Sequence, residues 1–142
     1  MARHGTNASQ PRNTYRRGAS GKRPWGTWRV VDLDNAFVVK RIVVMPGERL
    51  SLQRHSGRAE HWFIVEGSGT VTLGTRNRRV RAGEAVDIPV QMVHRLANDG
   101  KVPLTLIEIQ HGPVLDEADI ERLSDDYRRV PAARAPRATS RK

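Results

Sequence analysis

The middle of the chain alternates short apolar segments with turn-forming residues, and this pattern restricts the possible folds more than any other feature. Val, Ile, Leu and aromatic residues occupy alternate positions in segments 28–32, 37–45, 49–55, 60–67, 69–75, 78–82, 84–89, 93–98 and 104–110. Pairs such as Pro46-Gly47 and Ser56-Gly57 separate them, as turns between strands do. No helical period runs through these segments. We therefore expect an all-β fold, an antiparallel sandwich or barrel.

A different pattern follows in "DEADIERLSDDY", residues 116–127. Asp116 can serve as a helix N-cap, and Asp119 follows three residues later in a capping-box-like arrangement. The apolar positions then mark one helical face, formed by Leu115, Ile120, Leu123 and Tyr127. The sequence predicts a short C-terminal helix that packs across one end of the barrel.

The two ends of the chain differ from the middle in charge. Residues 1–22 and 128–142 hold eleven of the 25 Lys and Arg residues and no Asp or Glu. They also lack large apolar residues, so they cannot bury enough surface to offset the entropy of ordering. We expect two disordered basic tails around one domain at 23–127. The tails could attract nucleic acid weakly and non-specifically, or they could simply aid solubility.

Two absences narrow the function classes. The chain has no cysteine, which excludes disulfides and thiolate metal ligands. No apolar run approaches the length of a membrane span, so a cytoplasmic protein is expected.

Polar residues gather at one hairpin, "SLQRHSGRAEHWFIVEG", residues 51–67. Side chains alternate faces along a strand, so Ser51, Gln53 and His55 share one face. A turn then delivers Glu60 to the next strand, opposite or diagonal to His55. Imidazole, carboxylate and amide oxygen on one face suit a divalent cation of borderline character. The alternative from these residues alone is a solvated polar face.

A second segment favours the metal site. The first has the spacing G-x5-Q-x-H-x4-E-x6-G, and the second, "GEAVDIPVQMVHRLAN", has G-x5-P-x4-H-x3-N; together they fix Gly47, Gln53, His55, Glu60, Gly67, Gly83, Pro89, His94 and Asn98. This two-part pattern resembles that of the cupin superfamily. The resemblance implies a single jelly-roll-like barrel, a homodimer through the N-terminal strands, and the ligand set Gln53, His55, Glu60 and His94. Zinc is the first expectation for the ion, and Mn, Co, Ni or Fe would also fit.

A closer resemblance covers residues 23–127. "RPWGTW" (23–28), the segment 39–67, "IPVQMVHRLANDGKVPLTLIEIQHG" (88–112) and "DIERLSDDY" (119–127) are similar to type II phosphomannose isomerases. These also form the C-terminal half of bifunctional mannose-1-phosphate guanylyltransferase/mannose-6-phosphate isomerases. The chain departs from that family at Gln91, Asp116 and Arg128, where the family has Gly, at Val114, where it has Tyr, and at Ala118, where it has Asp. It has no Gly-rich phosphate loop, so guanylyltransferase activity is not expected.

The resemblance implies a metal-dependent isomerase of mannose 6-phosphate and fructose 6-phosphate. Arg58, on the turn between His55 and Glu60, is the candidate for the phosphate. Glu108 and Lys40 could face the barrel interior, the former as a base and the latter as a substrate contact. His61 is a second catalytic candidate, although alternation directs it away from Glu60.

Three other functions remain open at the level of sequence. The domain could bind a sugar phosphate or another small molecule without catalysis. It could be an iron-dependent cupin oxygenase, although Gln53 in place of His argues mildly against that. It could also act as a nucleic-acid-associated protein through its tails.

Overall fold

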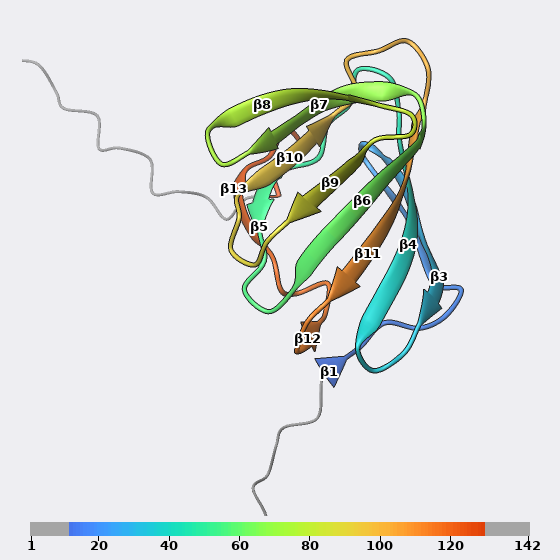
Figure 1. Cartoon of the computed structure of the whole chain (residues 1–142), viewed down its shortest axis with the longest axis vertical. Helices are drawn as coiled ribbons and strands as arrows, with labels where there is room; N and C mark the ends of the chain where they lie inside the picture. Colours follow the sequence, from blue (N-terminus) through green and yellow to red (C-terminus); the bar gives the residue numbers. More distant parts are fainter. Residues whose placement is uncertain (1–11, 130–142) are drawn as a thin grey trace, which may run out of the picture.

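Two antiparallel sheets face each other across a shared interior (Figure 1). The computed structural model describes residues 12–129. The larger sheet runs in the order β2 (Ser20–Arg23), β3 (Gly26–Leu33), β4 (Phe37–Val44), β11 (Leu104–His111), β6 (Ala59–Glu66) and β9 (Ala85–Ile88). The smaller sheet runs β13 (Glu121–Ser124), β5 (Leu52–Arg54), β10 (His94–Ala97), β7 (Ser68–Leu73) and β8 (Arg76–Arg81). A short parallel pair, β1 (Arg12–Asn13) with β12 (Val114–Leu115), lies at one end. The expected all-β fold is confirmed.

One residue carries the chain from the first sheet to the second. β6 ends at Glu66 and β7 begins at Ser68, so Gly67 alone makes the change of sheet. Its φ is 84°, and a Cβ there would lie 2.7 Å from the carbonyl oxygen of Pro103. Only glycine meets both demands without strain, which explains this fixed position in the spacing.

The interior has an apolar end and a polar end. At the apolar end, Ile64 of β6, Leu96 of β10 and Leu104 of β11 are fully buried with their neighbours. At the polar end, two to four residues away on the same strands, the buried side chains are those of Glu60, His94 and Glu108. Alternation keeps every second side chain inside throughout, so the same strands build both the core and the site.

The C-terminal helix is not present. No helix occurs between residues 12 and 129, and therefore none there could span a membrane. Residues 121–124 form β13, which pairs with the edge of β5, and Arg54 and Glu121 form an ion pair of 2.7 Å across it. Asp119 accepts hydrogen bonds from the backbone N–H groups of Ser56 and Gly57 instead of capping a helix. The prediction was wrong because a free strand edge and distant N–H groups outcompeted the local helical pattern.

The ordered domain also begins before residue 23. β1 and β2 lie within the segment 1–22, which was expected to be disordered. β2 pairs with β3 through residues 20–23, so backbone hydrogen bonds to a sheet edge order a segment that is poor in apolar side chains. Residues 1–11 and 130–142 lie outside the described part of the chain, as do most of the predicted tails.

The nine strands expected between residues 28 and 110 are all found as β3 to β11. Two departures from the resembled family also have a structural counterpart. Of the three positions where the resemblance implies Gly, namely 91, 116 and 128, Gln91 and Arg128 are the two non-glycine residues with positive φ in the described chain, at 68° and 61°. The backbone keeps a conformation suited to Gly although the residue has changed.

Candidate metal centre and surrounding pocket

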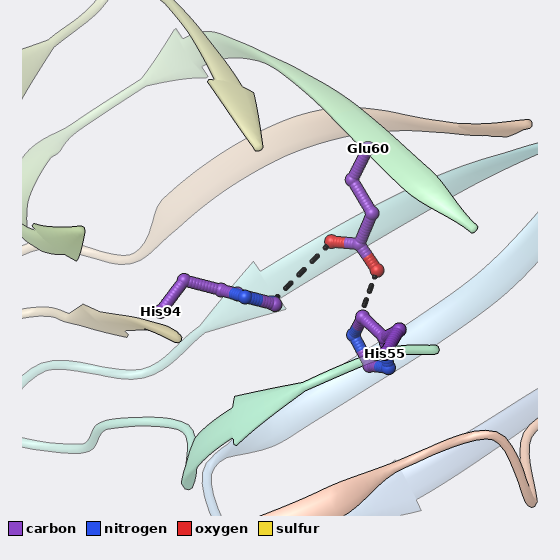
Figure 2. A group of neighbouring side chains, drawn as sticks. All are labelled: His55, Glu60 and His94. Carbon is purple, nitrogen blue, oxygen red and sulfur yellow. Dashed lines mark ion pairs between the residues drawn. The ribbon is translucent and has the colours of Figure 1, made fainter. Parts of the chain in front are cut away.

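Three strands bring together the His–Glu–His cluster, which consists of His55, Glu60 and His94 (Figure 2). His55 directly follows β5, Glu60 lies near the start of β6, and His94 begins β10. One ligand atom from each residue lies within 4.8 Å of the others, and all three side chains are buried. The structure thus brings the three predicted residues together, and their role as metal ligands stays a prediction.

Backbone carbonyls orient both imidazoles. The His55 Nδ1 lies 2.7 Å from the carbonyl oxygen of Asp119, and the His94 Nδ1 lies 2.8 Å from that of Met92. A carbonyl can only accept, so each Nδ1 carries a hydrogen, and the Nε2 of each ring is the nitrogen that is left to face the centre. The two Nε2 atoms point at the Glu60 carboxylate, at 3.0 Å for His55 and 3.7 Å for His94. The Nε2 of His94 is buried and has no hydrogen-bond partner among residues 12–129.

This donor set fits a divalent cation. Imidazole nitrogens held by a second hydrogen bond to a carbonyl are the usual protein ligands of zinc and related ions. The imidazole nitrogens and the carboxylate oxygens are all electron-rich and face one another in a buried space. A cation bound between them would supply the positive charge that this arrangement favours. The unpartnered Nε2 of His94 is the observation that makes the fit specific.

Charges around Glu60 favour its ionised form. Burial alone would raise the pKa of Glu60, but the hydrogen bond and charge of His55, with the charges of His94 and Arg58, hold it well below its usual range. The pKa of His94 is lowered, mainly by burial. A Glu60 carboxylate anion and a neutral His94 imidazole are the forms that metal binding requires of these two residues.

Gln53, the fourth expected ligand, lies beside this cluster. Its Cα pairs with that of His94 across β5 and β10, so both side chains point to the same side of the sheet. The Gln53 side chain is buried and lines the same cavity as His55 and Glu60. Its role as a ligand stays a prediction.

Arg58 and Lys40 are both buried in the pocket wall. The Arg58 Nε donates to Glu60 Oε1 at 3.2 Å, and one terminal nitrogen donates to the Asp116 carbonyl oxygen at 2.9 Å. Lys40 Nζ donates to the Tyr15 hydroxyl at 3.0 Å and also contacts Glu117. Both cations therefore hold carboxylates in place, and substrate contact stays a prediction for each.

Glu108 faces the interior, as alternation predicted. It is buried on β11, lines the cavity and accepts a hydrogen bond from Gln110 Nε2. Burial and the nearby charge of Glu60 raise the pKa of Glu108 to about 7, although Lys40 and Arg58 oppose the shift. A carboxyl group with this pKa can accept and return protons near neutral pH.

The structure does not bring His61 to the pocket. Its side chain is 41% exposed on the outer face of β6 and pairs with Asp87 of β9. No bend interrupts the alternation between Glu60 and Trp62, which are both buried, so the residue between them must point outward.

Sequence reasoning missed Tyr15 and Glu117. The Tyr15 hydroxyl donates to Glu117 at 2.9 Å, and both residues lie near Lys40 at the pocket. Tyr15 comes from a segment expected to be disordered, and Glu117 from the expected helix. Local sequence carried no signal for either, because long-range pairing places them.

Comparison with solved structures supports the fold. The oxalate decarboxylase of Lactobacillus farciminis, in its formate complex, has a TM-score of 0.64 at 20% identity and covers 74% of this chain and 33% of that one. The cupin domain of Schizosaccharomyces pombe Cnp3 has a TM-score of 0.59 at 14% identity, over 61% of this chain and 64% of that one. Identities this low show a shared fold alone. With its two sheets and inward His–Glu–His cluster, the protein has a cupin fold.

Sequence comparison then identifies the family. The family described as "Mannose-6-phosphate isomerase C-terminal" matches residues 10–125, and the chain belongs to it. The alginate biosynthesis protein AlgA of Pseudomonas aeruginosa is 50% identical over 108 residues, 76% of this chain and 22% of AlgA. The mannose-1-phosphate guanylyltransferase of Escherichia coli K12 is 44% identical over 108 residues, 76% of this chain and 23% of that protein. The chain spans less than a quarter of the length of these relatives.

Proposed function

We propose that this domain interconverts mannose 6-phosphate and fructose 6-phosphate with the help of a divalent metal ion. The observation that carries the proposal is the paired orientation of His55 and His94, whose Nε2 atoms both face the Glu60 carboxylate. Membership of the mannose-6-phosphate isomerase C-terminal family supports the choice of substrate. The relatives' own names concern mannose 1-phosphate and alginate synthesis, and they belong to much longer proteins.

His55, Glu60 and His94 would hold the ion, with Gln53 as the neighbouring neutral oxygen donor. A divalent ion bound there supplies Lewis acidity toward the sugar oxygens at C1 and C2. Arg58 keeps Glu60 ionised and fixed through its hydrogen bond of 3.2 Å. Because both imidazoles are also tied to carbonyls, the donor set needs little rearrangement before it acts.

The isomerisation moves one proton from C2 to C1 of the sugar through an enediol and a second proton from the C2 oxygen to the C1 oxygen. Glu108 is the proposed base, because it is buried in the same cavity and its pKa is about 7. It would take the C2 proton onto a carboxylate oxygen, where it can exchange with solvent, and then donate a proton to C1. Gln110, which donates to Glu108, keeps the carboxyl group oriented toward the cavity.

Turnover and metal content together test this function. The full 142-residue chain, loaded in turn with Zn, Mn, Co, Ni or Fe, is incubated with mannose 6-phosphate, and fructose 6-phosphate is followed by NMR. We expect turnover that disappears on chelation and returns with metal. Metal bound at one ion per chain with no turnover of any aldose phosphate would favour a non-catalytic binding domain instead. Dimer formation and nucleic-acid contact by the tails stay predictions from the sequence.

A further inference from the structure

Three arginines from separate segments line the open side of the cavity. The arginine cluster consists of Arg23 at the end of β2, Arg122 in β13, and Arg129 just beyond β13. All three are half-buried, whereas His55, Glu60 and Glu108 in the same cavity are buried. The cluster therefore lies on the solvent side of the metal centre.

Arg122 is tied to the metal centre by strand register. Its Cα pairs with that of Gln53 across β13 and β5, and Gln53 in turn pairs with His94 across β10. Directly paired residues in antiparallel strands lie about 5 Å apart and point to the same side. A single row of side chains thus runs from the metal centre outward to Arg122.

The cluster lacks an adequate anionic partner. Among residues 12–129, neither Arg23 nor Arg122 forms an ion pair with a carboxylate, and the buried Nε of Arg122 has no acceptor. Burial lowers the pKa of Arg122, and the charges of Arg129 and Arg23 lower it further, although Asp125 and Glu117 oppose them. Arg129 alone is paired, to Asp125 at 2.7 Å. An unrelieved group of like charges at a cavity is a site for an anion.

Trp28 adds an unpartnered donor to the same wall. Its indole Nε1 is buried without an acceptor among the described residues and lines the cavity, and the Arg23 guanidinium lies 5.5 Å from its ring centroid. A buried N–H without an acceptor is unfavourable, so an oxygen atom of a ligand that accepts from it would stabilise the protein. Arg58, by contrast, already donates to Glu60.

We propose that the arginine cluster, and not Arg58, binds the phosphate group of the substrate. Guanidinium forks match the paired oxygens of a phosphate, and three of them suit a dianion. The cavity has a volume of about 70 Å³ and is lined by the buried groups of the centre as well as by the half-buried arginines, so the sugar's reactive end would lie at the former and the phosphate at the latter. This assignment rests on the proposed function for the identity of the substrate.

Binding of inorganic phosphate to the full-length chain tests the assignment without requiring catalysis. Isothermal titration would compare wild type with Arg122→Gln, Arg23→Gln and Arg58→Gln, and with Arg76→Gln as a charge-matched control on the exposed strand β8. We expect Arg122→Gln and Arg23→Gln to weaken phosphate binding roughly tenfold or more, and Arg76→Gln to change it less than about twofold. Two variants on different strands protect the test if one of them folds poorly, which thermal unfolding would show.

The outcomes separate this proposal from the proposed function. Phosphate binding that depends on Arg122 and Arg23 supports the site even if no isomerase activity is found. Unchanged binding in both variants, loss only in Arg58→Gln, or no binding by wild type at millimolar phosphate would overturn it. If the wild type is active, the same two variants should raise KM for mannose 6-phosphate while leaving kcat within a few fold.

Discussion

The polar and apolar ends of the barrel share strands but have opposite chemistry. β10 places His94 at one end and Leu96 at the other, and both are buried. β11 likewise carries Glu108 toward the polar end and Leu104 toward the apolar end. On β10, a distance of two residues separates a polar side chain of the candidate metal site from an apolar side chain of the core. The comparison indicates that the apolar end stabilises the fold and leaves the polar end free to be reactive.

Shortening a buried side chain at the apolar end should cause the largest loss of stability. Leu96 is fully buried, so Leu96→Ala should lower the free energy of unfolding by about 2–5 kcal/mol. Metal affinity of the folded fraction should be nearly unchanged, since the His–Glu–His cluster is left intact. Urea denaturation and metal titration measure the two quantities. A larger effect on metal affinity than on unfolding would contradict the separate roles of the two ends.

Removing a side chain at the polar end should weaken metal binding strongly and change the free energy of unfolding less. His94→Ala removes one ligand and should weaken divalent metal binding by roughly 100-fold or more. Without metal, its effect on unfolding should be smaller than that of Leu96→Ala, because the buried Nε2 of His94 makes no hydrogen bond and only a long contact of 3.7 Å with Glu60. His111→Ala, an exposed histidine on β11, is the control. Unchanged metal stoichiometry in His94→Ala would refute the ligand set.

The pH dependence of stability should carry a signature of Glu108. Its pKa in the folded chain is about 7, above the ordinary value of 4.5, so the folded state holds the proton more tightly. This contribution is complete below pH 4.5 and is lost as pH rises toward 7, by at most about 1.4 kcal/mol per pH unit. The difference in unfolding free energy between wild type and Glu108→Gln should fall in that window. If this difference in unfolding free energy does not change with pH, the Glu108 carboxyl group is more exposed to solvent than the structure indicates.

The smallest effect is expected on the outer face of β6. His61→Ala removes a half-exposed ion pair with Asp87, so unfolding should change by less than about 0.5 kcal/mol and isomerase activity should be unaffected. Steady-state kinetics measure the second point. A loss of activity above about tenfold would show that His61 reaches the substrate after all.

The central strands and the convergence of His55, Glu60 and His94 could be expected from the sequence. Alternation and turn residues are local signals, so β3 to β11 could be predicted from the chain alone. The spacing of His55, Glu60 and His94 also reflects local geometry within hairpins and the resemblance to cupins. Their backbone partners, the carbonyls of Asp119 and Met92, could not be foreseen from residue types.

The edge strands and their side chains were not predictable in this way. β2 and β13 are short and polar, and only their partners β3 and β5 make them strands. Arg122 therefore looked like part of a solvated helix, although register places it beside Gln53. Tyr15 was missed for the same reason. Residues that are placed by long-range strand pairing cannot be recognised from the local periodicity of the sequence.

Isomerisation in D₂O tests the central claim most directly. Metal-loaded wild type and Glu108→Gln would be incubated with mannose 6-phosphate, and both sugars would be followed by proton NMR. We predict fructose 6-phosphate with solvent deuterium at C1 for wild type, and a rate lower by roughly 10²–10⁴-fold for Glu108→Gln. Equal rates for the two proteins, or no fructose 6-phosphate with any of the divalent ions, would contradict proton transfer at the polar end of this barrel.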